Sequence, residues 1–132
     1  MAGPRKGSKG GKKVKKNISL AYAKLGNQAL TDGNANKGID YLTKAVEYNN
    51  YDAAYLSLAK IYSELEEWDK SIAASDDALK YRSKISKGGP YFYMGVSYKG
   101  KGENEKAKEM FNKAKSDATY KKTAEYELSL LD

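Results

Sequence analysis

The sequence contains no cysteine and no histidine. Disulfides, thiolate nucleophiles, zinc sites with Cys or His ligands and imidazole acid–base chemistry are therefore excluded. The lack of cysteine fits the reducing environment of the cytoplasm, which is the location we expect. The acidic residues Glu64, Glu66 and Glu67 and the pair Asp76-Asp77 are interspersed with lysines, a pattern typical of solvated helix charges. We expect no catalytic activity, no cofactor and no metal.

Long apolar runs are also missing. No stretch approaches the ~20 apolar residues that a membrane-spanning helix requires. The basic start is followed after Lys16 by NISLAYAKLGNQ, which is too polar for the core of a signal peptide. We expect neither a membrane span nor a secretory signal in this sequence.

Negative charge is absent from the first 17 residues, although the formal net charge of the chain is +7. This segment carries seven cations, and the rest of the chain holds 17 basic and 17 acidic residues. A Gly/Lys-rich segment of this kind buries too little apolar surface to become ordered, so we predict a disordered basic tail over residues 1–17. It is either an arm for nucleic acid, an anionic membrane or an acidic partner, or an extension that only aids solubility. The cations are Arg5, Lys6, Lys9, Lys12, Lys13, Lys15 and Lys16.

The middle of the chain carries two apolar stripes at helical spacing. The first stripe has Tyr55, Leu58, Ala59 and Tyr62 at i, i+3, i+4 and i+7, and the second has Trp68, Ile72, Ser75 and Leu79. Such spacing places each set on one face of an α-helix. Only a short polar turn separates the two helices, so they form an antiparallel hairpin. One hairpin cannot bury both stripes and needs neighbours.

The same pattern recurs on both sides of this hairpin. Leu25, Leu58 and Met94 are equivalent and stand 33 and 36 residues apart, on either side of the 34-residue period of tetratricopeptide repeats. The chain therefore resembles three tandem repeats of the tetratricopeptide (TPR) family. The match is carried in the first helices by Tyr22-Leu25-Gly26, Tyr55-Leu58-Ala59-Tyr62 and Met94-Gly95-Tyr98. In the second helices it is carried by Ala45, Ala78, Ala107, Phe111 and Ala114.

This resemblance implies an all-α fold, an α-solenoid of three hairpins. We expect the repeats at about residues 18–50, 51–83 and 87–117, with Asn17 as the N-cap of the first helix. A last helix, within residues 118–132, is expected to cover the third hairpin, because terminal repeats need a cap. The sequence departs from the family in two places. Ser75 stands where a large side chain is usual, and Glu66 replaces the glycine of the hairpin turn.

The resemblance also implies a ligand site, because first helices line the concave face of a TPR superhelix. The stripe opposite the packing residues is expected to form this groove. Leu56 and Phe92 are large apolar residues off the packing stripe, so they are either ligand anchors or covered by neighbouring helices. The predicted groove residues are Asn27, Leu56, Lys60, Ser63, Phe92, Val96 and Lys99.

These observations predict a non-enzymatic scaffold or adaptor that binds a peptide segment of a partner protein. Leu56 and Phe92 favour apolar anchors in the ligand, and Lys60 and Lys99 favour a net negative charge. The carboxylate clamp of some TPR domains is mostly absent, because Ala23, Gly89 and Tyr93 stand where its basic residues would be. Two alternatives are a nucleic-acid-associated protein that binds weakly through the basic tail, and a structural subunit of a larger helical assembly. We expect a monomer or a weak oligomer.

Overall fold

The computed structural model describes residues 9–132, and this part of the chain is helical throughout, with no strand. Arg5 and Lys6 of the predicted basic tail lie outside the described residues. The helices are connected by short turns, except for a longer loop between α4 and α5. Their bounds are α1 Lys9–Thr31, α2 Ala35–Tyr48, α3 Asp52–Glu64, α4 Trp68–Lys80, α5 Gly88–Gly100, α6 Asn104–Ala114 and α7 Lys121–Leu131.

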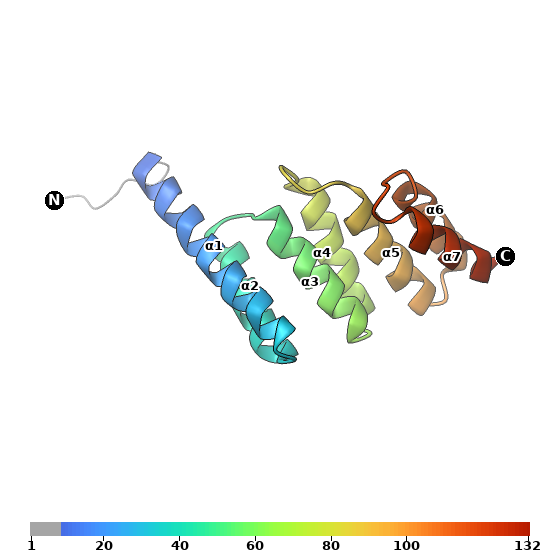
Figure 1. Cartoon of the computed structure of the whole chain (residues 1–132), viewed down its shortest axis with the longest axis horizontal. Helices are drawn as coiled ribbons and strands as arrows, with labels where there is room; N and C mark the ends of the chain where they lie inside the picture. Colours follow the sequence, from blue (N-terminus) through green and yellow to red (C-terminus); the bar gives the residue numbers. More distant parts are fainter. Residues whose placement is uncertain (1–8) are drawn as a thin grey trace.

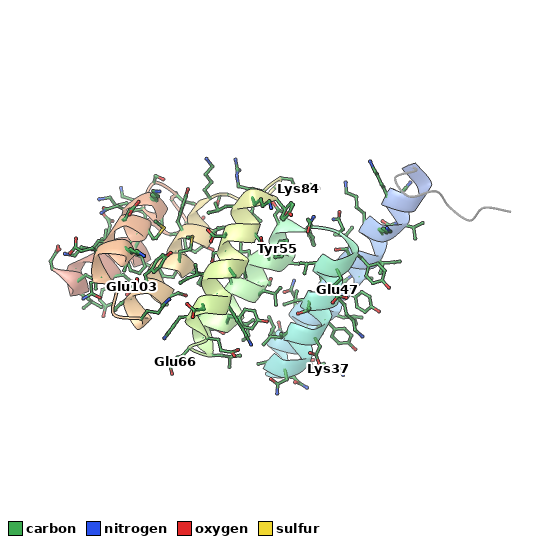
Figure 2. The ribbon with its side chains drawn as sticks, turned by 180° about the vertical axis from the view of Figure 1, so that it is seen from behind. Lys37, Glu47, Tyr55, Glu66, Lys84 and Glu103 are labelled. Carbon is green, nitrogen blue, oxygen red and sulfur yellow. The ribbon has the colours of Figure 1, made fainter. Side chains whose placement is uncertain are left out.

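Helices α1 to α6 form three antiparallel hairpins that follow one another along the long axis of the molecule (Figure 1). The first helices α1, α3 and α5 lie on the face seen in Figure 1, and α2, α4 and α6 lie on the face seen in Figure 2. Helix α7 packs against the last hairpin. This is the all-α solenoid that the repeat pattern predicts.

The two helices of a hairpin approach closely because a small residue on one helix faces a large one on the other. A methyl group added at Gly26 would stand 2.7 Å from Leu42 Cγ, and one added at Gly95 would stand 2.7 Å from the Phe111 ring. In the second hairpin the equivalent positions are Ala59 and Ser75, and both are fully buried. There the Ser71 hydroxyl donates to the Ala59 carbonyl at 2.7 Å and ties α4 to α3.

Each hairpin turn contains one residue in the left-handed region. The φ angles are 83° at Gly33, 59° at Glu66 and 81° at Gly102. Glycine adopts this conformation without steric cost, whereas a side chain costs free energy there. The turn of the second hairpin therefore has the same backbone shape as the others despite its glutamate.

Residues 9–17 belong to helix α1, so the prediction that they form part of a disordered tail is wrong. Asn17 lies in the middle of this helix and is not its N-cap. The physical reason is cooperativity: the packed part of α1 acts as the nucleus, and every further residue adds one backbone hydrogen bond. Lysine is a good helix former, so the helix continues through the basic segment.

The last helix begins at Lys121 rather than at Ala118. The backbone N–H of Thr119 donates to Asp117 Oδ1 at 3.0 Å, and the backbone N–H of Tyr120 donates to the Asp117 carbonyl at 3.0 Å. These bonds close a turn ahead of α7. Helix α7 then buries Ala124 completely, with Leu128 and Leu131 packed against the same apolar cluster as Phe111.

Candidate functional site

A cleft of about 360 Å³ opens between α1 and α3, on the face formed by the first helices. It exists because the first two hairpins touch mainly through α2 and α3, whereas α3 packs against α5 directly. Two of the predicted groove residues, Asn27 and Lys60, line it from opposite sides. The full lining is Asn27, Leu30, Thr31, Ser57, Lys60, Ile61 and Glu64.

The cleft combines apolar walls with a polar rim. Leu30 is half-buried and Ile61 is 9% exposed, so both offer apolar surface at the wall of the cleft. Asn27, Lys60 and Glu64 are exposed at the rim. Lys60 and Glu64 stand one turn apart on α3 and have opposite charges. The arrangement suits a segment with one apolar side chain and hydrogen-bonding groups on either side of it.

Phe92 and Val96 do not lie in an open groove, because α7 and its preceding turn cover this part of α5. The Phe92 ring centroid is 5.6 Å from that of Phe111 and 5.5 Å from that of Tyr120. Val96 packs against the same cluster. The terminal element therefore covers part of Phe92, as the alternative to an exposed ligand anchor expected, and a role of Phe92 in ligand binding stays a prediction.

Leu56 is half-buried against the start of α5. A methyl group added at Gly89 would stand 2.9 Å from Leu56 Cδ1 and 3.0 Å from the Tyr120 hydroxyl. Leu56 and Tyr120 thus occupy the space where a longer side chain at residue 89 would lie. This position, one of those where the clamp of some TPR domains has a basic residue, is buried in this chain.

Ser63 and Lys99 are engaged within the fold. Ser63 is 7% exposed, and its hydroxyl donates to the Lys60 carbonyl at 2.6 Å. The Lys99 ammonium pairs with the Glu127 carboxylate of α7 at 2.8 Å. Of the two predicted groove lysines, Lys99 is paired with a carboxylate of the fold and Lys60 lines the cleft, one turn from Glu64.

Ser57, Ile61 and Glu64 were missed by the sequence interpretation. They follow the predicted residues Leu56, Lys60 and Ser63 by one position, so the face of α3 that borders the cleft is turned by one residue from the predicted stripe. Their spacing of i, i+4 and i+7 was visible in the sequence as a second stripe. Only the splay between α1 and α3 reveals which of the two stripes borders open space.

The described residues contain neither a metal-binding cluster of acidic side chains nor a membrane-spanning helix. Within residues 9–132 no group of three or more acidic side chains could hold a metal ion. No helix within these residues is long and apolar enough to cross a membrane.

Comparisons with known proteins agree with the geometry. No family model and no curated protein sequence matches the chain. Several solved structures are similar in fold. Among them, the TPR domain of Arabidopsis OM64 has a TM-score of 0.81 at 20% identity, covering 89% of this chain and 96% of that one. The N-terminal domain of stress-induced protein-1 from C. elegans has a TM-score of 0.73 at 16% identity, covering 86% and 96%. The chain therefore has the fold of a tetratricopeptide repeat domain, with three helical hairpins followed by a seventh helix.

Proposed function

We propose that this chain is a non-enzymatic interaction module that binds a peptide segment of a partner protein in the cleft between α1 and α3. The observation that carries the proposal is the cleft of about 360 Å³, with apolar walls at Leu30 and Ile61 and a polar rim. An open cleft with apolar walls and a few polar groups at its rim is suited to holding a ligand. We place this binding in the cytoplasm.

The lining indicates what kind of peptide fits. One large apolar side chain of the ligand would lie between Leu30 and Ile61, because burial of apolar surface supplies most of the affinity at small sites. The Asn27 amide both donates and accepts, so it can hold a peptide backbone whatever the side chains are. Lys60 and Glu64 together favour a ligand that carries both signs of charge beside its apolar anchor, in place of the net negative charge expected from Lys60 and Lys99.

The test is a selection of ten-residue peptides from a random display library on the immobilised full chain. We expect enriched peptides to share one large apolar residue. The double variant Asn27→Ala with Lys60→Ala should weaken their binding by about tenfold or more, because interface anchors and their polar partners carry most of the affinity. The matched control is Asn36→Ala with Lys24→Ala, since both residues are exposed and lie outside the cleft.

Circular dichroism and melting curves should be the same for all three proteins, because none of the four positions is buried. Peptides that bind the double variant and the control equally would show that the cleft between α1 and α3 is not the site. An unenriched library would contradict the proposed function itself.

A further inference from the structure

A second cleft, of about 400 Å³, lies at the edge of the array near the start of α1. Three segments that are distant in the sequence line it: the basic part of α1, the loop between α2 and α3, and the loop between α4 and α5. Figure 2 shows Lys84, in the loop between α4 and α5, on the same edge of the array as the start of α1. Glu66 lies at the other end of α4. The lining is Lys13, Lys16, Asn17, Leu20, Asn49, Asn50, Tyr51, Asp52, Tyr81, Ser83 and Lys84.

Helix formation in the basic segment creates one side of this cleft. Lys13, Lys16, Asn17 and Leu20 stand at i, i+3, i+4 and i+7 of α1, so they share one helix face. A disordered tail would have spread these cations over many directions. In the helix the two ammonium groups and the Asn17 amide face the loops, and Leu20, which is 49% exposed, adds apolar surface beside them.

The opposite side is held in place by a buried carboxylate. Asp52 Oδ2 accepts hydrogen bonds from the backbone N–H groups of Ser83, Lys84 and Ile85, at 2.7, 2.8 and 3.0 Å. Asp52 Oδ1 accepts from the backbone N–H of Ala53 at 2.9 Å. The only acidic group of the cleft is therefore saturated by the protein's own donors. It fixes the loop that carries Lys84 and leaves the three lysines as the charges that a ligand meets.

The polar groups of the cleft include donors suited to an acidic ligand. Asn50 Oδ1 accepts a hydrogen bond from the Tyr55 hydroxyl at 2.9 Å, which leaves its Nδ2 group to donate to a ligand. Three lysines and this amide present donors to carboxylate oxygens. All three lysines are exposed, so their positive charges attract anions to the cleft from a distance.

The aromatic residues of the cleft decide against nucleic acid. Proteins that bind single strands stack bases on free ring faces. The Tyr81 ring is stacked on Tyr55, with a centroid distance of 5.8 Å and an interplanar angle of 17°, and the Lys80 ammonium lies 5.2 Å from its centroid. Tyr51 packs against the core of the first two hairpins. One face of the Tyr81 ring is thus covered by Tyr55, and Tyr51 is partly buried against the core, so the two rings are less suited to stacking bases than free rings are.

We propose that this edge cleft is a second binding site, for an acidic peptide segment of a partner protein whose carboxylates meet Lys13, Lys16 and Lys84. The asparagine amides hold the peptide backbone between these contacts. Successive side chains of an extended peptide point to opposite sides, so alternate residues of an acidic run lie on one side and can face the lysines of α1. The site is separate from the cleft between α1 and α3, and Lys60 takes no part in it.

The experiment titrates the full chain with a fluorescent decapeptide in which glutamate alternates with alanine. A ten-nucleotide oligothymidylate at the same ionic strength is the competing probe. The double variant Lys13→Glu with Lys16→Glu should weaken peptide binding by about tenfold or more, because each reversal replaces an attraction by a repulsion. The matched control is Lys121→Glu with Lys122→Glu, which makes the same change of net charge on exposed residues of α7.

A second variant, Lys84→Glu, tests the cleft rather than the helix alone. Lys84 lies in the loop between α4 and α5 and lines the same cleft as Lys13 and Lys16. Its replacement by glutamate should therefore weaken peptide binding about threefold or more, because one attraction becomes a repulsion. Equal losses for the α7 control would show a general charge effect and overturn the proposal. So would full binding by Lys84→Glu, tighter binding of the oligonucleotide than of the peptide, or no peptide binding at all. Loss of the library-selected peptides in the Lys60 variant has no bearing on this result, so the two proposals fail independently.

Discussion

One buried carboxylate, that of Asp52, holds the loop between α4 and α5 in place. Asp52 is 1% exposed, although it is charged and lies at the first position of α3. Burial of a carboxylate is unfavourable unless hydrogen bonds replace its hydration. Four backbone N–H groups supply this replacement, three of them from the loop between α4 and α5. One residue of the second hairpin thus orders the entry to the third.

The pH dependence of stability should reflect this carboxylate. Burial raises the pKa of Asp52, but the backbone N–H groups of Ser83, Ile85, Lys84 and Ala53 outweigh burial and hold the pKa below its usual value. The lowered pKa contributes stability that is present above the unfolded-state value of about 3.9 and is lost as pH falls through the folded-state pKa. We expect Asp52→Asn to lower the free energy of unfolding at pH 7 by about 1–3 kcal/mol, because an amide has one acceptor oxygen instead of two and carries no charge, so at least one of the four N–H groups loses its acceptor.

Urea denaturation at pH 7 and at pH 3 measures this prediction. The difference in the free energy of unfolding between the wild type and Asp52→Asn should be smaller at pH 3. This pH lies below the unfolded-state pKa of about 3.9, so the carboxylate of the unfolded chain binds a proton. The control is Asp40→Asn, since Asp40 is an exposed carboxylate on α2. An unchanged difference at the two pH values would show that the charge of Asp52 is not what holds the loop.

At the scale of the helical elements, the turns repeat more faithfully than the sequence does. Gly33 and Gly102 occupy the left-handed position in the outer hairpins, and Glu66 takes the same conformation in the middle one. The second hairpin also lacks a large side chain at Ser75. It relies instead on the bond from Ser71 to the Ala59 carbonyl and on the contact of Trp68 with Gly100 of α5.

Glycine at the middle turn should therefore stabilise the protein. We expect Glu66→Gly to raise the free energy of unfolding by about 0.5–1 kcal/mol, because glycine removes the left-handed penalty that the glutamate side chain imposes. Urea denaturation is again the measurement. Glu67→Gly is the matched control: it removes the same charge at the adjacent residue, whose φ is −90°, so it should not stabilise. A Glu66→Gly protein no more stable than the wild type would contradict this account of the turn.

At the scale of the whole molecule, α7 covers the C-terminal end of the array, whereas the junction between the first two hairpins is open at the cleft between α1 and α3. Helix α7 covers α5 and α6 and contributes the fully buried Ala124 to their cluster. The first two hairpins instead leave a cleft between α1 and α3. The contrast explains why the large apolar residues Phe92 and Val96 of α5 are packed against a cluster, whereas α1 and α3 border an open cleft.

Removal of residues 118–132 should destabilise the array and promote association. The truncation uncovers Phe92 and Val96 and takes away Ala124, so we expect the melting temperature to fall by about 5 °C or more. Size-exclusion chromatography should show larger species through the uncovered apolar face. The control is Tyr126→Ser with Leu130→Ser in the full chain, since these α7 side chains are 63% and 53% exposed. A truncated protein that stays monomeric and equally stable would mean that α7 does not act as a cap.

The sequence by itself determined the hairpins and their number. It also placed Leu58 and Met94 correctly on packing faces, whereas Leu25, their equivalent in the repeat pattern, is 48% exposed. Helical periodicity and the repeat spacing are local properties, and the buried small–large pairs Gly26–Leu42 and Gly95–Phe111 follow from them. Tertiary structure decided which off-stripe residues remain open. Whether Phe92 or Lys60 meets solvent depends on what packs against it from elsewhere. Tyr120, just ahead of α7, lies against Phe92, whereas Lys60 borders the cleft between α1 and α3. Tertiary structure also made the basic segment helical, because the helix of residues 9–17 extends from a nucleus that only the packed first hairpin provides. The cleft that joins Lys13 and Lys16 to Lys84 follows from that helix and from the Asp52 contacts, and no local pattern encodes it.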